Sequence, residues 1–214
     1  MKTLYVSGWG ARPDSEHAAR CDMVCNWYDA ESLIAASTVP LVVLGWSLGA
    51  MVSCECALRY PQIVKGLFLY APTLQFIGGA HGLPLPPLRA MERGCRHDHH
   101  AIIAAYLDSI YVPAHLQDTQ MDVATALAGL RMLATWDWHE KILSLACPVS
   151  CSADRADLVI ALEASREFWY HLSRPVSWYT TDVGHAAPCL LEATLAEREK
   201  EFCEFIKRES APQL

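Results

Sequence analysis

Ser47 follows a tryptophan and has a glycine two residues away on either side, in the stretch Gly45-Trp46-Ser47-Leu48-Gly49. Small residues around a serine permit the sharp strand-to-helix turn that lifts a nucleophilic hydroxyl clear of the backbone. The apolar run LVVL precedes this stretch and the helix-forming run AMVSCECALRY follows it. The alternative to a nucleophile is a glycine-rich turn in which Ser47 has no catalytic role. The context favours a nucleophile beside a helix N-terminus, where free N–H groups and the helix dipole are available.

A serine nucleophile needs a histidine base, and the base needs a carboxylate to orient it. His185 is the candidate because it follows the β-rich run VSWYTTDVG, which ends in a glycine that allows a tight loop. A histidine in a loop just past a strand points over the sheet edge where Ser47 would lie. The alternative is that His185 lies in a surface loop and has no catalytic role. Asp154 and Asp157 compete for the third role, since both fall where a strand beginning at Val149 should end. The chain order of serine, aspartate and histidine is that of the α/β-hydrolase arrangement.

Short β-rich runs recur along the chain between helical patterns. The predicted strands are Thr3–Ser7, Met23–Tyr28, Leu41–Trp46, Gly66–Tyr70, Val149–Ser152 and Val176–Thr180. The predicted helices around them include Leu48–Tyr60, Leu162–Leu172 and Leu191–Lys207. Apolar strands that alternate with helices indicate a parallel sheet covered on both faces, which is an α/β fold.

The stretch from about residue 73 to residue 146 has a different character. It begins with the segment GGAHGLPLPP, whose glycines and prolines break regular structure. Helical patterns follow over Leu88–Arg96, Asp98–Tyr111, Met121–Thr135 and Trp138–Ala146, without a convincing strand. We predict a single domain over 1–214, with its core at 1–72 and 147–214. The helical insertion at 73–146 would form a lid over the carboxyl edge of the sheet.

The composition limits the classes of protein that this chain can belong to. It has 214 residues, of which 52% are hydrophobic and 19% charged, so disorder is excluded. A formal net charge of −7 argues against nucleic-acid binding driven by bulk charge. Nine cysteines, an odd number without a C-x-x-C pair, suit buried reduced thiols. No run suits a signal peptide or a membrane span, so we expect a cytoplasmic monomer without membrane or nucleic-acid partners.

Taken together, these residues resemble the α/β-hydrolase superfamily over nearly the whole chain. Members often have a Cys-Pro pair, a short strand, and a loop aspartate followed by a small apolar run. Here Cys147-Pro148 begins that pattern, and its aspartate falls on Asp157. The resemblance therefore favours Asp157 over Asp154 as the partner of His185.

The resemblance also implies an oxyanion hole made of two backbone N–H groups. One belongs to Leu48, the residue after the nucleophile. The other belongs to Trp9, in the loop Ser7-Gly8-Trp9-Gly10 that follows the first strand. Two strands that usually precede this loop are missing, so the resemblance implies a mainly parallel sheet of about six strands with helices on both faces.

The two tryptophan motifs, GWG in the early loop and GWSLG at the turn, resemble the pimeloyl-[acyl-carrier protein] methyl ester esterases of biotin synthesis, in a compact form. That resemblance implies a serine carboxylesterase that converts the methyl ester of pimeloyl-acyl-carrier protein into pimeloyl-acyl-carrier protein and methanol, without a cofactor. A general short-chain carboxylesterase or thioesterase of the same fold is the alternative. A second alternative is a catalytically inactive binding protein. The presence of the complete set of Ser47, Asp157 and His185 argues against it.

Two features of the insertion bear on this substrate. An acidic carrier protein needs cations near the pocket mouth, and Arg89, Arg93 and Arg96 share one helical face in LRAMERGCRH. We predict that the carrier docks there, with an ordinary solvated basic stripe as the alternative.

An apolar stripe in DHHAIIAAYLDSIYVP could line an acyl channel, although packing against the core is favoured. The nearby cysteine, aspartate and histidines are too crowded to converge on a metal ion, so no metal site is expected.

Overall fold

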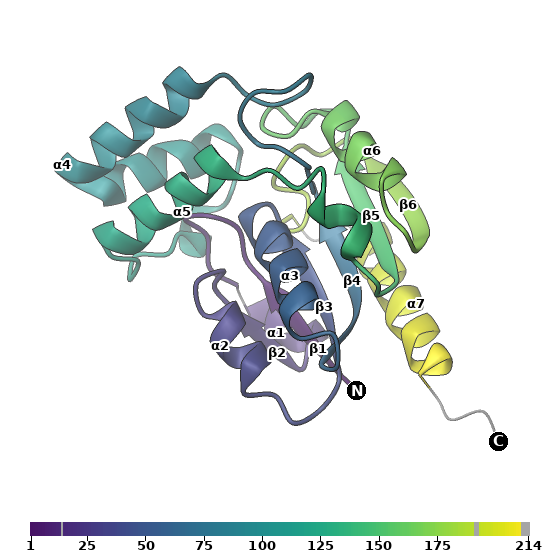
Figure 1. Cartoon of the computed structure of the whole chain (residues 1–214). Helices are drawn as coiled ribbons and strands as arrows, with labels where there is room; N and C mark the ends of the chain where they lie inside the picture. The colour runs from purple at the N-terminus through teal and green to yellow at the C-terminus, as the bar shows by residue number, and fades with distance from the viewer. Residues whose placement is uncertain (14, 191–192, 211–214) are drawn as a thin grey trace.

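The computed structural model describes residues 1–13, 15–190 and 193–210 of the chain. A six-stranded sheet forms its centre, with every strand parallel to its neighbours and the order β2-β1-β3-β4-β5-β6 (Figure 1). The strands are β1 (Lys2–Val6), β2 (Met23–Cys25), β3 (Leu41–Trp46), β4 (Val64–Tyr70), β5 (Val149–Asp154) and β6 (Pro175–Thr181). Each overlaps one of the six strands predicted from the sequence, and the predicted α/β architecture is confirmed.

Helices cover both faces of this sheet. In Figure 1, α2 (Ala30–Ala35), α3 (Leu48–Arg59) and α6 (Leu162–Tyr170) lie in front of it, and α1 (Ser15–Arg20) and α7 (Ala193–Glu209) lie behind it. All six residues of β3 are buried, which explains why this strand reads as an unbroken apolar run. The short helices α1 and α2 were not among the sequence predictions. The predicted start of the last helix, at Leu191, lies outside the described residues.

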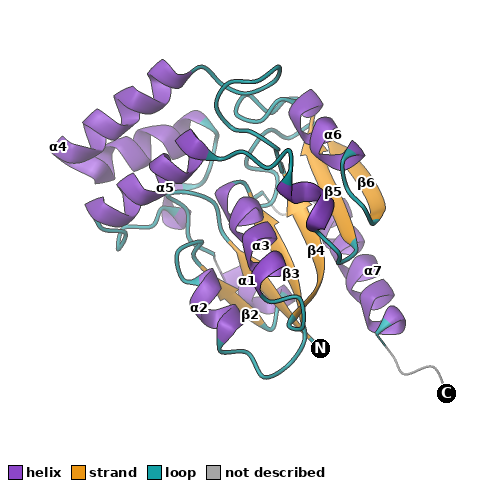
Figure 2. Ribbon diagram, in the orientation of Figure 1, coloured by secondary structure: helices purple, strands orange, loops and turns teal. Residues whose placement is uncertain are grey.

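A helical segment connects β4 to β5 and lies beyond the carboxyl ends of the strands (Figure 2). It contains α4 (Leu85–Ser109), the 3₁₀ helix η1 (Ala114–Leu116), α5 (Val123–Thr135) and the 3₁₀ helix η2 (Lys141–Ser144). The helices α4 and α5 pack against each other. The loop that follows β1 is tied to this segment as well, because the Arg12 N–H donates to the Leu116 carbonyl at 2.8 Å and the Asp118 N–H donates to the Gly10 carbonyl at 2.8 Å.

The predicted break between the patterns Leu88–Arg96 and Asp98–Tyr111 is present, because α4 consists of two helical halves that meet at a kink at Asp98 (φ −152°, ψ 91°); the second half ends at Ser109. The Asp98 carboxylate accepts from the Ala101 N–H at 3.0 Å and so caps the second half of α4. The predicted helix Trp138–Ala146 is wrong apart from the short η2. The Trp138 N–H donates to the Leu74 carbonyl at 2.9 Å, and a single turn in which the Ile142 N–H donates to the Trp138 carbonyl at 2.9 Å leads into η2.

The remaining sequence features are simple to place. All nine cysteines are free of disulfide bonds, and all except Cys147 are buried. Burial raises the pKa of the Cys25 thiol to about 12, so this thiol stays protonated at neutral pH. Among the described residues, no helix combines the length and the apolar character that crossing a bilayer requires.

Candidate active site

Ser47 occupies the turn between β3 and α3. Its backbone has φ 56° and ψ −121°, a region that non-glycine residues seldom adopt and that is concentrated at functional turns. Glycines on either side make the turn possible. A Cβ on Gly49 would lie 2.4 Å from the Ser7 carbonyl oxygen, and a Cβ on Gly45 would lie 2.7 Å from the Cα of Ala50. The strand, the helix and the loop after β1 therefore meet closely around the serine.

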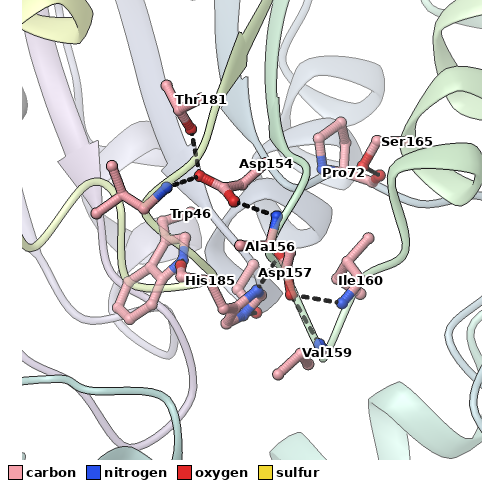
Figure 3. Close-up of polar contacts among 12 residues, drawn as sticks. Trp46, Pro72, Asp154, Ala156, Asp157, Val159, Ile160, Ser165, Thr181 and His185 are labelled. Carbon is pink, nitrogen blue, oxygen red and sulfur yellow. Dashed lines mark hydrogen bonds and ion pairs between the residues drawn. The ribbon is translucent and has the colours of Figure 1, made fainter.

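His185 joins Ser47 to Asp157 through two hydrogen bonds. Its Nε2 atom lies 3.0 Å from the Ser47 hydroxyl, and its Nδ1 atom lies 2.7 Å from an Asp157 carboxylate oxygen. The other Asp157 oxygen accepts from the N–H groups of Val159 and Ile160, which fixes the carboxylate (Figure 3). The His185 and Asp157 side chains are each only 1% exposed, so water cannot compete for their contact. Such an arrangement can take a proton from the serine and stabilise the imidazolium that forms.

Asp154, the other candidate for the acid, makes its hydrogen bonds elsewhere (Figure 3). Its carboxylate accepts from the Ala156 N–H at 2.7 Å, the Thr181 hydroxyl at 2.5 Å and the Val183 N–H at 2.6 Å. Burial acts to raise the pKa of Asp154, but these hydrogen bonds outweigh burial and hold the pKa below its usual value. Of the two aspartates, the structure therefore brings only Asp157 against His185.

Trp46 makes a contact with the histidine that the sequence did not reveal. Its indole Nε1 donates to the backbone carbonyl of His185 at 2.9 Å, and the two rings lie 5.7 Å apart. The indole is 1% exposed. The GWSLG motif therefore contains the candidate nucleophile and also supports the histidine backbone.

The two proposed oxyanion donors lie next to the serine. Leu48 follows Ser47 at the start of α3, where helix N–H groups have no intrahelical partner. Trp9 lies in the loop after β1, and a Cβ on the adjacent Gly8 would lie 3.3 Å from the Ser47 Cβ. Within the described residues, neither the Trp9 nor the Leu48 N–H donates to another backbone carbonyl.

The Trp9 side chain joins the loop after β1 to the helical insertion. Its Nε1 donates to the Ala126 carbonyl of α5 at 2.9 Å, and its ring meets that of Tyr106 of α4 edge to face. A Cβ on Gly129 of α5 would lie 2.5 Å from the Trp9 ring, so this glycine admits the indole. The insertion consequently helps to position the loop that carries Trp9.

An apolar cavity of about 190 Å³ opens beside Ser47. It lies between the helical insertion and the loop that follows β5, and Leu88, Met91, Tyr106, Leu130, Leu158 and Val159 are among its lining residues. The lining contains no charged side chain. A cavity of this kind suits an uncharged aliphatic chain attached to the group that Ser47 would attack.

The apolar stripe in the second half of α4 contributes little to this cavity. Of its members, Tyr106 lines the cavity. Ile103 and Leu107 are buried in the core, at 2% and 0% exposure. Tyr111 is 77% exposed. Packing against the core, the alternative favoured from the sequence, therefore accounts for most of this stripe.

Arg89, Arg93 and Arg96 are all exposed and lie on the first half of α4, before its kink. Leu88 and Met91, which line the cavity, belong to the same half, but at 3.6 residues per turn the three arginines lie on a different face of the helix from them. Arg89 forms an ion pair with Glu92 at 2.7 Å. The histidine-rich end of this half holds no group of three or more metal-ligating side chains, and neither does the rest of the described chain.

Comparison of the sequence with known proteins gives relatives of low identity that carry one name. A pimeloyl-[acyl-carrier protein] methyl ester esterase from Vibrio atlanticus is 23% identical over 85% of this chain and 77% of its own length. An esterase of the same name from Nitrosomonas europaea is 27% identical over 79% of this chain and 75% of its own length. A scan against protein-family models finds no match. The resemblance to these esterases that the two tryptophan motifs indicate is thus confirmed.

Solved structures establish the fold. The esterase EaEST from Exiguobacterium antarcticum superposes with a TM-score of 0.78 and 12% identity, covering 97% of this chain and 92% of its own. A hydrolase from Pseudomonas aeruginosa superposes with a TM-score of 0.76 and 14% identity, covering 94% and 89%. At such identities the likeness concerns the fold alone, and the fold is that of the α/β-hydrolases.

Proposed function

We propose that this chain, which has the α/β-hydrolase fold, is a serine carboxylesterase. The observation that carries the proposal is the continuous hydrogen-bonded chain from Ser47 through His185 to Asp157, at the edge of an apolar cavity. A serine on a positive-φ turn, a buried imidazole and a fixed carboxylate together make up a nucleophile, its base and the group that orients the base. No cofactor enters this chemistry.

Each residue has a defined role in the proposed reaction. His185 removes the Ser47 proton as the serine oxygen attacks the ester carbonyl, and Asp157 keeps the imidazole in the required tautomer. The Trp9 and Leu48 N–H groups donate to the oxyanion of the tetrahedral intermediate, where a single donor can be worth about 3 kcal/mol. His185 then returns the proton to the departing alcohol. Water, activated by the same imidazole, hydrolyses the acyl-enzyme and releases the free acid.

The proposed substrate is the methyl ester of pimeloyl-acyl-carrier protein, in the pathway to biotin. Relatives that cover most of this chain are named for that ester. The uncharged cavity suits an aliphatic acyl chain, and methanol is small enough to leave from a confined site. Arg89, Arg93 and Arg96 are exposed on the half of α4 that also contributes Leu88 and Met91 to the cavity, and they would attract an acidic carrier protein. The carrier is the partner that this proposal requires.

The mechanism is tested by replacing the nucleophile. Purified protein should hydrolyse a short p-nitrophenyl ester and should be labelled by a fluorophosphonate probe. Ser47→Ala should abolish both, a loss of at least about 10⁴-fold in kcat, because the oxyanion hole and binding alone retain little activity. Equal turnover by the variant would refute the mechanism. Absence of labelling in the unmodified protein would instead favour an inactive binding protein.

The substrate is tested separately. Methyl pimeloyl-carrier protein should be hydrolysed with a higher kcat/KM than the same acyl methyl ester on a small alcohol or thiol. Expression of the chain should also restore growth without biotin to a bacterial strain that lacks its own methyl esterase. Equal kcat/KM for the carrier-bound and small esters, together with failure to rescue growth, would indicate a general short-chain esterase.

A further inference from the structure

One buried carboxylate connects the two loops that carry the acid and the base of the site. Asp154 is the last residue of β5, pairs in register with Thr181 at the end of β6, and is 4% exposed. We call residues 155–161 the acid loop, since it carries Asp157. We call residues 182–190 the histidine loop, since it carries His185.

The two oxygens of this carboxylate serve different loops. Oδ1 accepts from the N–H of Ala156 in the acid loop at 2.7 Å. Oδ2 accepts from the N–H of Val183 in the histidine loop at 2.6 Å and from the Thr181 hydroxyl at 2.5 Å. Ala156 is the residue before Asp157, and Val183 lies two residues before His185. Figure 3 shows this carboxylate between the two loops.

We infer that Asp154 is a positioning residue that sets the distance between Asp157 and His185 by holding the acid loop and the histidine loop with its two oxygens. The inference rests on the proposed function for its effect on turnover. The 2.7 Å contact between Asp157 and His185 joins two loops, so its geometry depends on what ties the loops together. A buried ionised carboxylate does this well, because hydrogen bonds to a charged acceptor are shorter and stronger than neutral ones.

An amide cannot replace the carboxylate at this place. Asn at position 154 would offer one oxygen and one NH₂ group. In either orientation, the NH₂ group would face a backbone N–H, that of Ala156 or that of Val183. One loop would therefore lose its anchor while the shape of the side chain stayed the same.

The decisive variant is Asp154→Asn, studied in the full-length protein. We expect kcat to fall about 10- to 100-fold with KM changed less than about threefold, because a misplacement of about 1 Å can cost about 100-fold. The far-downfield proton NMR resonance of the His185 Nδ1 proton should shift or broaden, since it reports the contact with Asp157. Because this resonance requires no substrate, the inference can fail independently of the proposed esterase activity.

Asp22→Asn is the matched control. Asp22 also accepts from a threonine, through the Thr3 N–H at 2.7 Å and the Thr3 hydroxyl at 3.0 Å, but at the opposite, amino-terminal end of the sheet. This variant should keep kcat and the Nδ1 resonance of the unmodified protein. If Asp154→Asn does not fold, Thr181→Val removes one of the three donors and should lower kcat by several fold with the same NMR change.

Two results would overturn the inference. One is an unchanged kcat in whichever Asp154 or Thr181 variant folds. The other is a reduced kcat with an unaltered Nδ1 resonance, because that would mean that Asp154 supports the fold without setting the contact between Asp157 and His185.

Discussion

At the scale of single residues, the catalytic geometry depends on groups beyond those that would react. Ser47, His185 and two candidate aspartates can be identified in the sequence, because their residue types and chain order fit a nucleophile, a base and an orienting carboxylate. The hydrogen bond that Trp46 makes with His185 cannot be identified in this way. Its indole supports the His185 carbonyl from a position 139 residues away in the chain. Such a contact exists only after β3 and the histidine loop have been brought together.

Trp46→Phe tests this support. The change removes the hydrogen bond to the His185 carbonyl and leaves an aromatic ring in place. We expect kcat to fall about 3- to 30-fold through misalignment of the imidazole, measured on a p-nitrophenyl ester. Trp136→Phe is the matched control, because the Trp136 indole also donates to a buried backbone carbonyl, that of Thr73 at 3.2 Å, away from the serine. An equal loss of kcat in both variants would contradict the specific role of Trp46.

The choice between Asp154 and Asp157 shows what local sequence can predict at this scale. Both aspartates follow the same strand, three residues apart, and either could reach over the sheet edge. The resemblance to the superfamily favoured Asp157, and the structure places that residue against His185. Besides the local hydrogen bond from Ala156, Asp154 accepts from β6 and the histidine loop, 27 and 29 residues further along, and nothing in the sequence nearby specifies these two bonds.

At the scale of elements, patterns of apolar residues predicted the sheet well because its central strands β3, β4 and β5 are almost wholly buried, although the edge strands β2 and β6 are mostly only partly buried. They failed where tertiary pairing decides the outcome. The stretch Trp138–Ala146 has a helical pattern, yet Trp136 and Trp138 stack with ring centroids 5.2 Å apart, and Trp138 donates to Glu55 of α3 at 3.0 Å. These contacts fix Trp138 against neighbouring segments, and only Lys141–Ser144 forms a short 3₁₀ helix. The kink of α4 at Asp98 coincides with the boundary between two predicted helices, because an aspartate there can cap the second half.

The helix α7 carries a buried acid that should make stability depend on pH. Glu199 forms an ion pair with Arg20 of α1 at 2.9 Å and accepts from the Tyr70 hydroxyl of β4. Burial raises the pKa of Glu199 to about 7, and Arg20 lowers it only in part. The native state therefore holds a proton that the unfolded chain releases above its pKa of 4.5. Stability is full below about pH 4.5, falls as pH rises toward 7, and then levels off.

Glu199→Gln should remove this pH dependence. Relative to the variant, the unmodified protein should lose up to about 3 kcal/mol of unfolding free energy between pH 4.5 and 7, measured by urea denaturation at several pH values. Glu201→Gln is the control, because Glu201 lies on the same helix but is exposed and pairs only with Arg198 among the described residues. Parallel curves for the unmodified protein and Glu199→Gln would contradict the prediction.

At the scale of the whole molecule, charge sets a condition on any acidic partner. The chain has a formal net charge of −7, so its overall field repels an acidic carrier protein. Attraction must come from a local group of cations near the cavity. Arg93 and Arg96 fit this requirement, because both are exposed on α4 and neither forms an ion pair within the described part of the chain. Arg89 is partly neutralised by its pair with Glu92.

The double variant Arg93→Glu/Arg96→Glu should therefore lower kcat/KM for methyl pimeloyl-carrier protein by about 10- to 100-fold at low salt, and leave hydrolysis of a small ester unchanged. The salt dependence of kcat/KM provides a sharper test, because added salt should change kcat/KM in opposite directions in the two proteins. Added salt should lower kcat/KM for the unmodified protein, because it screens the local attraction. In the variant only repulsion remains, so added salt should raise kcat/KM.

Arg166→Glu/Arg208→Glu is the control for this experiment, since it makes the same change in net charge on α6 and α7, away from the cavity-lining half of α4. An equal loss of kcat/KM in the control would mean that bulk charge governs the encounter with the carrier. A loss with the small ester as well would mean that the α4 variant disturbs the cavity itself. Only a loss confined to the carrier-bound ester and to the α4 arginines, with the reversed salt response, identifies this half of α4 as the docking face.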